Sequence, residues 1–245
     1  MTSLCPPLWR RLLHAPRRSG RVALALALTL GAGPSLALPM ASQGYWMVMG
    51  DFEEGSNKLS ANYALTGRDA IGAAVARFDS LAHGGTGMRS SRELEALTYT
   101  RLVHRWNLPD AQANLWFIGQ VGSLRGQGLA GGARTLVSPA VLADWETTRL
   151  YLGGGVEAKR AGDWRRESAY ARTGFSLYEV EYEQVQPWIL LEARRERERI
   201  PRAGTPAHEA AKTEWMPMVR LIHRRWFLEL GARRDTAHLS FMWVP

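Results

Sequence analysis

The stretch RLYLGGGVEAK, Arg149–Lys159, alternates two kinds of side chain with the period of a β-strand. One face carries Leu150, Leu152, Gly154, Val156 and Ala158, and the other carries Arg149, Tyr151, Glu157 and Lys159. A soluble β-sandwich turns such an apolar face inward, whereas a membrane-spanning barrel turns it outward. The alternation therefore predicts a strand with one apolar face and leaves the direction of that face open.

Similar runs of alternating residues recur along the chain and are separated by turn residues, which predicts an all-β protein. Beyond the N-terminal region there is no long helical period and no second apolar run of ~18 residues. Twelve strands are predicted, over residues 45–50, 59–65, 70–79, 93–106, 113–125, 134–143, 149–159, 168–182, 187–195, 214–222, 226–233 and 238–244.

The links between these strands favour the barrel. With these boundaries the odd-numbered links average roughly ten residues and the even-numbered links roughly four. Alternation of short turns with long loops is typical of outer-membrane barrels, whose turns lie on the periplasmic side. An even number of strands also returns both chain ends to that side.

A change of phase marks one hairpin. Across residues 214–233 the apolar residues occupy odd positions up to Leu221 and even positions from Trp226 onward. A single strand would keep its phase. The sequence therefore predicts a tight turn at His223–Arg225.

The first 37 residues have the pattern of an export signal. Arginines precede the apolar run Val22–Leu30, and small residues up to Ala37 supply a cleavage site. Glycine and proline after Leu30 make the run too short for a membrane anchor. We expect a secretory signal peptide at 1–37, removed after Ala37, and one domain at 38–245.

The basic composition belongs largely to this signal. Residues 1–37 contain five arginines and no acidic residue, so the formal net charge falls from +8 for the whole chain to +3 without them. A nucleic-acid partner is not expected, because that function needs a concentrated basic surface on the folded domain. The only cysteine, Cys5, also lies in the signal, which excludes disulfides and thiolate chemistry from the mature chain.

Taken together, the signal, the alternation, the link lengths and the aromatic last strand HLSFMWVP resemble the bacterial outer-membrane β-barrel class. The resemblance covers nearly all of residues 44–244 and implies a single antiparallel up-and-down transmembrane barrel of about twelve strands, ten being the lower alternative. It also implies a Gram-negative outer-membrane location, with membrane lipid, lipopolysaccharide and the barrel-assembly machinery as partners. The chain departs from the class by ending in Pro245 rather than in an aromatic residue.

Charged residues assigned to the inner face would line the lumen of this barrel. They are Glu95, Arg101, Arg149, Glu157, Arg172, Glu192, Arg194, Arg220 and Glu229. An internal salt-bridge network is the favoured interpretation, since opposite charges across a narrow lumen would pair and close it. A conduction path is the alternative, because twelve strands lie between the plugged barrels of about eight and the open ones of 16 to 18.

Methionines form a second candidate site. In WMVMG, Trp46–Gly50, the tryptophan and valine share the apolar face, so the two methionines point inward. The inward group consists of Met47, Met49, Met216, Met218 and Met242, and it includes His238 on the last strand. Thioethers suit Cu(I), which makes a copper site possible. Packing of an irregular lumen is the favoured interpretation, because methionine fills such gaps; no other cofactor is expected.

No catalytic motif is present. The sequence has no G-x-S-x-G serine motif, and His104 and His223 fall at predicted turns, where an interfacial role is favoured. ARRERERIPR, Ala193–Arg202, is either a phosphate-contacting loop or a self-paired strand extension. We expect a non-enzymatic barrel with an envelope, transport or structural role. A barrel enzyme acting on lipid or envelope substrates, or a soluble periplasmic ligand-binding β-protein, are the alternatives.

Overall fold

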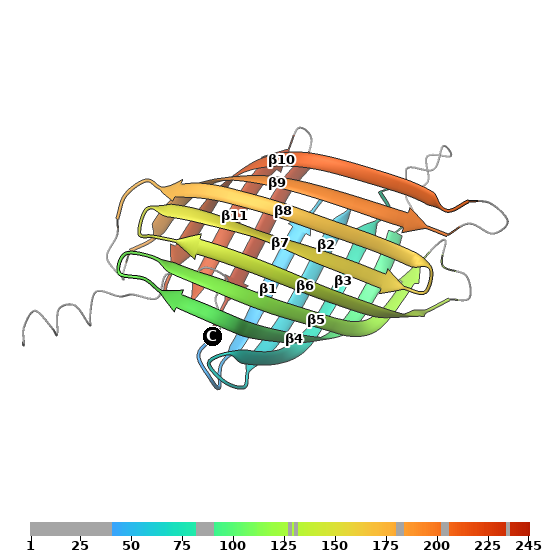
Figure 1. The fold of residues 1–245 in the computed structure, drawn as a ribbon, viewed down its shortest axis with the longest axis horizontal. Helices are drawn as coiled ribbons and strands as arrows, with labels where there is room; N and C mark the ends of the chain where they lie inside the picture. Colours follow the sequence, from blue (N-terminus) through green and yellow to red (C-terminus); the bar gives the residue numbers. More distant parts are fainter. Residues whose placement is uncertain are drawn as a thin grey trace, which may run out of the picture. The chain divides into compact units, whose positions relative to one another are not determined.

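The computed structural model describes residues 41–81, 91–126, 129, 132–179, 184–201, 206–233 and 236–245. These residues form a closed barrel in which each strand pairs with its neighbours in the chain (Figure 1). The strands are β1 (Trp46–Glu53), β2 (Ser56–Ala64), β3 (Asp69–Asp79), β4 (Ser91–Asn107), β5 (Gln112–Gly126), β6 (Arg134–Glu146), β7 (Leu150–Ala161), β8 (Trp164–Ser176), β9 (Gln186–Ile200), β10 (His208–His223), β11 (Trp226–Arg233) and β12 (Thr236–Trp243). The expected signal at 1–37 lies outside the described residues.

The first and last strands close the barrel. β1 pairs antiparallel with β12, from Val48↔Trp243 to Glu53↔His238. Every other pairing is also antiparallel, which confirms the up-and-down topology and the strand number of twelve. No helix in the described part of the chain is long and apolar enough to cross a membrane.

Two ends of the barrel are distinguished by their links. The links after the even-numbered strands share one end with residues 41–45 and 244–245, and we call it the terminal end. The links after the odd-numbered strands lie at the opposite end, the loop end. At the terminal end β10 turns into β11 at Arg224, whose φ is 38°, so the hairpin predicted from the change of phase is confirmed.

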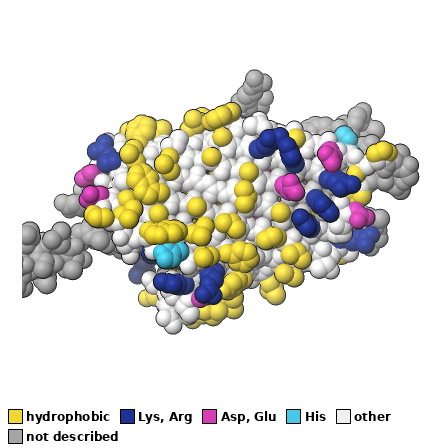
Figure 2. All heavy atoms as spheres, in the orientation of Figure 1, with side chains coloured by type: hydrophobic (Ala, Val, Ile, Leu, Met, Phe, Trp, Pro, Cys, Tyr) yellow, Lys and Arg dark blue, Asp and Glu magenta, His cyan; other side chains and the backbone are white. Residues whose placement is uncertain are grey.

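The outer surface is apolar and the interior is polar. Leu97, Val156 and Trp215 point outward and are 72%, 58% and 64% exposed. Glu192 and Glu229 point inward and are buried. Figure 2 shows hydrophobic side chains spread over much of the visible barrel wall, with the largest group of charged ones toward the right of the view. This distribution is that of a membrane-spanning barrel, since a soluble protein would bury the apolar face.

Strands at the loop end are longer than expected. β9 continues to Ile200 and β10 begins at His208, so most of the predicted 18-residue loop is strand. The outer residues of β9 there are Arg195, Arg197 and Arg199 rather than apolar residues, and Arg199 lies opposite Glu209 of β10. Cross-strand pairs of opposite charge stabilise a solvated extension. The tract Ala193–Arg202 is therefore a strand extension as far as Ile200.

The expected contrast in link length is reduced accordingly. Three links of the loop end, at 54–55, 162–163 and 234–235, have two residues each, whereas they were expected to be longer. The prediction was wrong because it ended each strand where apolar alternation stopped. Polar residues continue the strands beyond that point.

Glycines on β7 make room for aromatic rings inside the barrel. A Cβ at Gly153 would lie 2.4 Å from Oη of Tyr151, and a Cβ at Gly155 would lie 2.9 Å from Cε1 of Tyr170. Any side chain at these two positions would displace the rings. The glycines of the stretch Arg149–Lys159 therefore leave the space that these two tyrosine rings occupy inside the barrel.

Apolar clusters occupy both ends of the interior. At the loop end Phe78, Leu94, Leu124, Leu136 and Trp164 pack together. At the terminal end there are two clusters, one around Tyr151, Trp188, Leu190, Met216 and Met218, and one around Ala41, Met47, Ala64 and Met242. The charged side chains lie between these layers.

Candidate functional site in the lumen of the barrel

A buried charge network lines one wall of the lumen. Arg172 on β8 contacts Glu192 on β9 at 2.5 Å and Glu229 on β11 at 2.9 Å. Arg220 on β10 contacts the same Glu229 at 2.6 Å, and Glu192 contacts Arg194 at 2.9 Å. Each carboxylate thus meets two guanidinium groups, an arrangement that offsets the cost of burying the charges.

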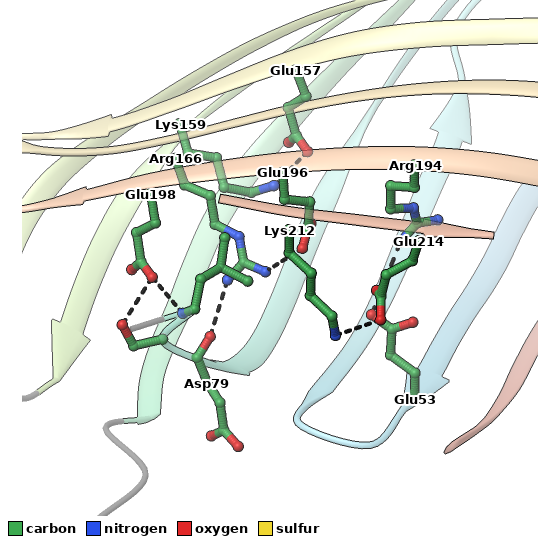
Figure 3. A network of polar contacts seen from close by, with 12 residues as sticks. Glu53, Asp79, Glu157, Lys159, Arg166, Arg194, Glu196, Glu198, Lys212 and Glu214 are labelled. Carbon is green, nitrogen blue, oxygen red and sulfur yellow. Dashed lines mark hydrogen bonds and ion pairs between the residues drawn. The ribbon is translucent and has the colours of Figure 1, made fainter. Parts of the chain in front are cut away.

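The network continues toward the loop end (Figure 3). Glu53 on β1 lies 4.0 Å from Arg194 and 3.2 Å from Arg233. Arg233 also contacts Glu214 at 2.6 Å, and Glu214 contacts Lys212 at 2.6 Å. Strands β8 to β11 and β1 are therefore joined by ion pairs on the inner face.

Further contacts lie nearer the loop end, on β6 to β9. Glu157 on β7 pairs with Lys159 two residues along and accepts a hydrogen bond of 2.8 Å from Ser138 on β6. Arg166 on β8 pairs with Glu196 on β9 at 3.0 Å. These side chains point toward the lumen (Figure 3).

Glu198 ties together opposite walls at the loop end. Its carboxylate, on β9, accepts hydrogen bonds from Arg92 on β4 at 2.6 Å and from Trp164 on β8 at 2.8 Å. It also accepts bonds from the hydroxyl of Ser80 and the backbone N–H of Leu81, at 2.8 and 2.6 Å. β9 pairs with β8 and β10 only, so the bonds from β4 and from the end of β3 cross the interior.

A second contact crosses the lumen beside the first. Nη1 of Arg166 donates a hydrogen bond of 3.1 Å to the carbonyl oxygen of Asp79, at the end of β3. The guanidinium carbon of Arg166 lies 5.1 Å from the centre of the Phe78 ring, within the range of a cation–π contact. Side chains and backbone groups of β3, β4, β8 and β9 thus meet across the lumen at the loop end.

Two cavities lie within the lumen. One has a volume of about 250 Å³ and lies toward the loop end, with Phe78, Glu157 and Arg194 in its wall. The other has a volume of about 210 Å³ and lies toward the terminal end, with Tyr151, Arg220 and Phe227 in its wall. The side chains common to both walls are Asp51, Lys58, Leu142 and Tyr170. The cavities are therefore adjacent chambers of one interior.

Six of the nine expected lumen charges point into the barrel. They are Glu157, Arg172, Glu192, Arg194, Arg220 and Glu229. They are joined to opposite charges, as the favoured network interpretation expected. The other three lie elsewhere.

Glu95 and Arg101 lie on the outer face, so the inner face of β4 was wrongly assigned. The inward residues of β4 include Leu94, Ala96 and Leu102, which are buried. Toward the loop end β4 belongs to the part with a charged exterior and an apolar interior, the reverse of the membrane pattern. The alternation was correctly recognised, but its direction was read as that of a lipid-facing strand.

Arg101 and Arg149 both lie toward the terminal end, where their side chains bind other groups at the rim of the barrel. Arg101 contacts Asp69 at 3.2 Å and its side chain is 54% exposed. Arg149 precedes β7, is exposed, and donates hydrogen bonds to the carbonyl oxygens of Ser176 and Leu177. The assignment of Arg149 to the lumen was wrong because the strand begins one residue later, at Leu150.

The methionines point inward as expected, but they fall into two groups. Met47, Met49 and Met242 pack with Phe227 near the seam between β1 and β12. Met216 and Met218 on β10 pack with Trp188 and Tyr151. All five have apolar or aromatic neighbours, a setting in which a flexible thioether fills space.

His238 lies apart from both methionine groups and beside acids. Its Nδ1 is 3.6 Å from Glu53 and 3.8 Å from Asp51, and its side chain is buried. The rings of His104 and His223 lie beside Trp106 and Trp226, at centroid distances of 4.4 and 5.5 Å. No group of three or more His, Cys, Asp or Glu side chains in the described residues could hold a metal ion.

Sequence reasoning missed the residues that cross the lumen. Glu198 continues the inward parity of Glu192, Arg194 and Glu196, so the alternation of β9 carried a signal for it. Arg92 could not be found in this way, because the sequence analysis assigned the inward and outward faces of β4 the wrong way round. Lys58 and Asp51 were also passed over, although they are inward residues of adjacent strands and oppose each other in register.

Comparison with known proteins adds little beyond the fold. No protein-family model matches the chain, and no curated protein matches it. Among solved structures, the toluene transporter TbuX of Ralstonia pickettii aligns with 9% identity and a TM-score of 0.38, over 83% of this chain and 88% of that one. CdiB from Acinetobacter baumannii aligns with 8% identity and a TM-score of 0.29, over 84% of this chain and 61% of that one. We draw no functional argument from similarities of this size.

Proposed function

We propose that the chain is a bacterial outer-membrane barrel that passes small polar solutes through a gated lumen. The observation that carries the proposal is the pair of adjacent chambers, with charged side chains in their walls, inside a closed barrel whose exterior is apolar. A barrel with a purely structural role has no need of such space, because side chains can fill a narrow lumen completely.

The crossing bonds of Glu198 would act as the gate. Arg92 and Glu198 are both buried, and their contact joins opposite walls at the loop end. Passage of a solute requires this contact to open. The expected behaviour of the unmodified barrel is therefore brief or rare opening rather than steady conduction.

We place the terminal end on the periplasmic side. Support comes from the export signal expected at 1–37 and from the even number of strands, which brings both ends of the barrel to one side. The loop end, with its charged strand extensions, would then face the lipopolysaccharide and the medium. Membrane lipid and the barrel-assembly machinery are the partners that this placement implies.

We further propose that the barrel is not an enzyme and holds no cofactor. His104 and His223, the histidines first weighed as catalytic, lie beside tryptophans at the terminal end, where an interfacial role accounts for them. Copper handling is left out of the proposal, because packing among aromatic and apolar neighbours accounts for both methionine groups.

Conductance in planar lipid bilayers tests the proposed function. The purified barrel is compared with the double variant Arg92→Met/Glu198→Gln, which removes both charges of the gate together. We expect rare small openings for the unmodified protein and a higher open fraction for the double variant. The matched control is Asp69→Asn/Arg101→Gln, which removes an exposed ion pair at the terminal end and should leave the openings unchanged. If both proteins are folded and neither conducts, the transport function is wrong.

A further inference from the structure

Two opposite charges stand at the junction of the two chambers. Asp51 on β1 and Lys58 on β2 oppose each other in register, and both line both cavities. No ion pair within 4.0 Å and no hydrogen bond joins the side-chain ammonium of Lys58 to any described residue. Within the described part of the chain, the charged contact of Asp51 is the one with Nδ1 of His238, at 3.8 Å.

The other charges in the cavity walls are paired. Glu157 pairs with Lys159, Arg166 with Glu196, and Arg194 with Glu192. Glu229 is shared by Arg172 and Arg220, and Glu53 contacts Arg233. Lys58 therefore differs from its neighbours, because it can take a charged partner without breaking an ion pair. Among the described residues, Asp51 has only the 3.8 Å contact with His238, which Glu53 shares.

A third group in the larger cavity also needs a partner. Gln120 on β5 lines that cavity and is 4% exposed, and its Oε1 accepts no hydrogen bond from the described residues. Buried polar atoms are almost always hydrogen-bonded in folded proteins. Gln120 therefore brings to the cavity wall a buried amide oxygen that no described residue matches, and a small rotation of the side chain would offer this oxygen to a donor inside the cavity.

We propose that the junction of the chambers binds a small zwitterion, of the class of α-amino acids. The carboxylate of the ligand meets the ammonium of Lys58, and its ammonium meets the carboxylate of Asp51 or Oε1 of Gln120. Charge-assisted hydrogen bonds of this kind are stronger than neutral ones. An anion would satisfy Lys58 and leave Asp51 and Gln120 unmatched, and a cation would do the reverse.

The size of the cavities limits the ligand. The two volumes are about 250 and 210 Å³, each below the roughly 300–1,000 Å³ that is usual for small-molecule sites. A compact amino acid fits within one chamber. The inference rests on the proposed transport function and names the solute class that the same lumen selects.

Equilibrium dialysis of the purified barrel with four three-carbon probes tests the site. The probes are radiolabelled L-alanine, L-lactate, propylamine and glycerol, which are a zwitterion, an anion, a cation and a neutral solute. We expect alanine to bind most tightly, and Lys58→Gln, Asp51→Asn and Gln120→Leu each to weaken it, Lys58→Gln by about tenfold or more. The control is Lys212→Gln, an inward lysine that lines neither cavity and pairs with Glu214, and it should bind alanine as the unmodified barrel does.

Access to the closed lumen is checked with the double variant Arg92→Met/Glu198→Gln in the same dialysis. If alanine binds neither this variant nor the unmodified barrel, the site is wrong. It is also wrong if all four probes bind alike, or if the three site variants bind alanine as well as Lys212→Gln does.

Flux into proteoliposomes separates this inference from the transport function on which it rests. With the double gate variant, equal flux of all four probes keeps transport and overturns the zwitterion site. Binding of alanine without flux of any probe keeps the site and overturns transport. Faster flux of alanine than of the other three probes supports both.

Discussion

Arg92 on β4 donates a 2.6 Å hydrogen bond across the lumen to Glu198 on β9, and both side chains are almost fully buried. A buried ion pair is weak evidence of net stability, because burial of each charge is costly. Removal of one partner alone is different, since it leaves the other charge without compensation. Single and double substitution of this pair should therefore differ clearly in their effect on the free energy of unfolding.

Glu198→Gln alone should destabilise the barrel by about 3–5 kcal/mol, because Arg92 remains buried without an opposite charge. Arg92→Met/Glu198→Gln should cost clearly less than the single change, since no uncompensated charge remains. Reversible urea unfolding in lipid vesicles measures both values. Equal losses for the single and double variants would show that the two side chains are not coupled.

Leu152→Arg should cost about 2–4 kcal/mol, because Leu152 points outward in the apolar part of β7 and is 52% exposed. Thr135→Arg is the matched control, since Thr135 is an exposed residue near the loop end of β6 and lies opposite the uncharged Ser123. The same unfolding measurement should show little change there. Equal costs at the two positions would contradict the assignment of the membrane-facing surface.

Gly153→Ala should also destabilise the barrel, for a reason unrelated to lipid. Gly153 adjoins Leu152 but faces the interior, where a Cβ would lie 2.4 Å from the hydroxyl of Tyr151. The loss should diminish when Tyr151→Phe removes that hydroxyl in the same chain. A double-mutant cycle of urea midpoints gives the coupling, and strict additivity would exclude the clash as the cause.

Ala207→Cys should react with a membrane-impermeant maleimide on intact cells, whereas Asp110→Cys should not. Ala207 precedes β10 at the loop end, and Asp110 lies in the link between β4 and β5 at the terminal end. The background is low, because the only natural cysteine, Cys5, lies in the expected signal. Labelling at Asp110→Cys alone would invert the proposed orientation.

Cu(I) should not bind the refolded barrel in competition with a soluble chelator. The thioethers of Met47 and Met242 are packed with Ala41 and Ala64, and Met216 and Met218 belong to a different cluster. The triple variant Met47→Leu/Met49→Leu/Met242→Leu serves as the comparison. Tight binding by the unmodified protein that is lost in this variant would restore the copper interpretation.

Most of the fold could be predicted from alternation alone. The period of two in stretches such as Arg149–Lys159 reflects a wall with one face toward lipid, and this condition holds along most of each strand. It fails where β4 and β9 leave the apolar zone, because charged residues then occupy the outer face. The strand ends at the loop end and the face of Glu95 were wrong for that reason. The eighth strand was wrong in the other direction, since it was predicted to continue to Tyr182 and ends at Ser176.

The site was less accessible to sequence reasoning. The charges of β8 to β11 could be assigned to the lumen, since parity along a strand gives the direction of each side chain. The contact of Glu198 with Arg92 could not, because it joins strands that are distant in both the sequence and the sheet. Which charges remain unpaired, as with Lys58, depends on side-chain geometry that no spacing pattern carries.

The seam between β1 and β12 has a kinetic consequence. It extends from Val48↔Trp243 to Glu53↔His238, whereas β9 and β10 pair from Ile200↔His208 to Gln186↔Ile222. The hairpin closes a short loop, but the seam joins the two ends of the folded chain, and contacts of such sequence separation form slowly. Barrel closure is therefore expected to be the last step of folding, and backbone amides of the seam should exchange with deuterium sooner than those of the β9–β10 hairpin.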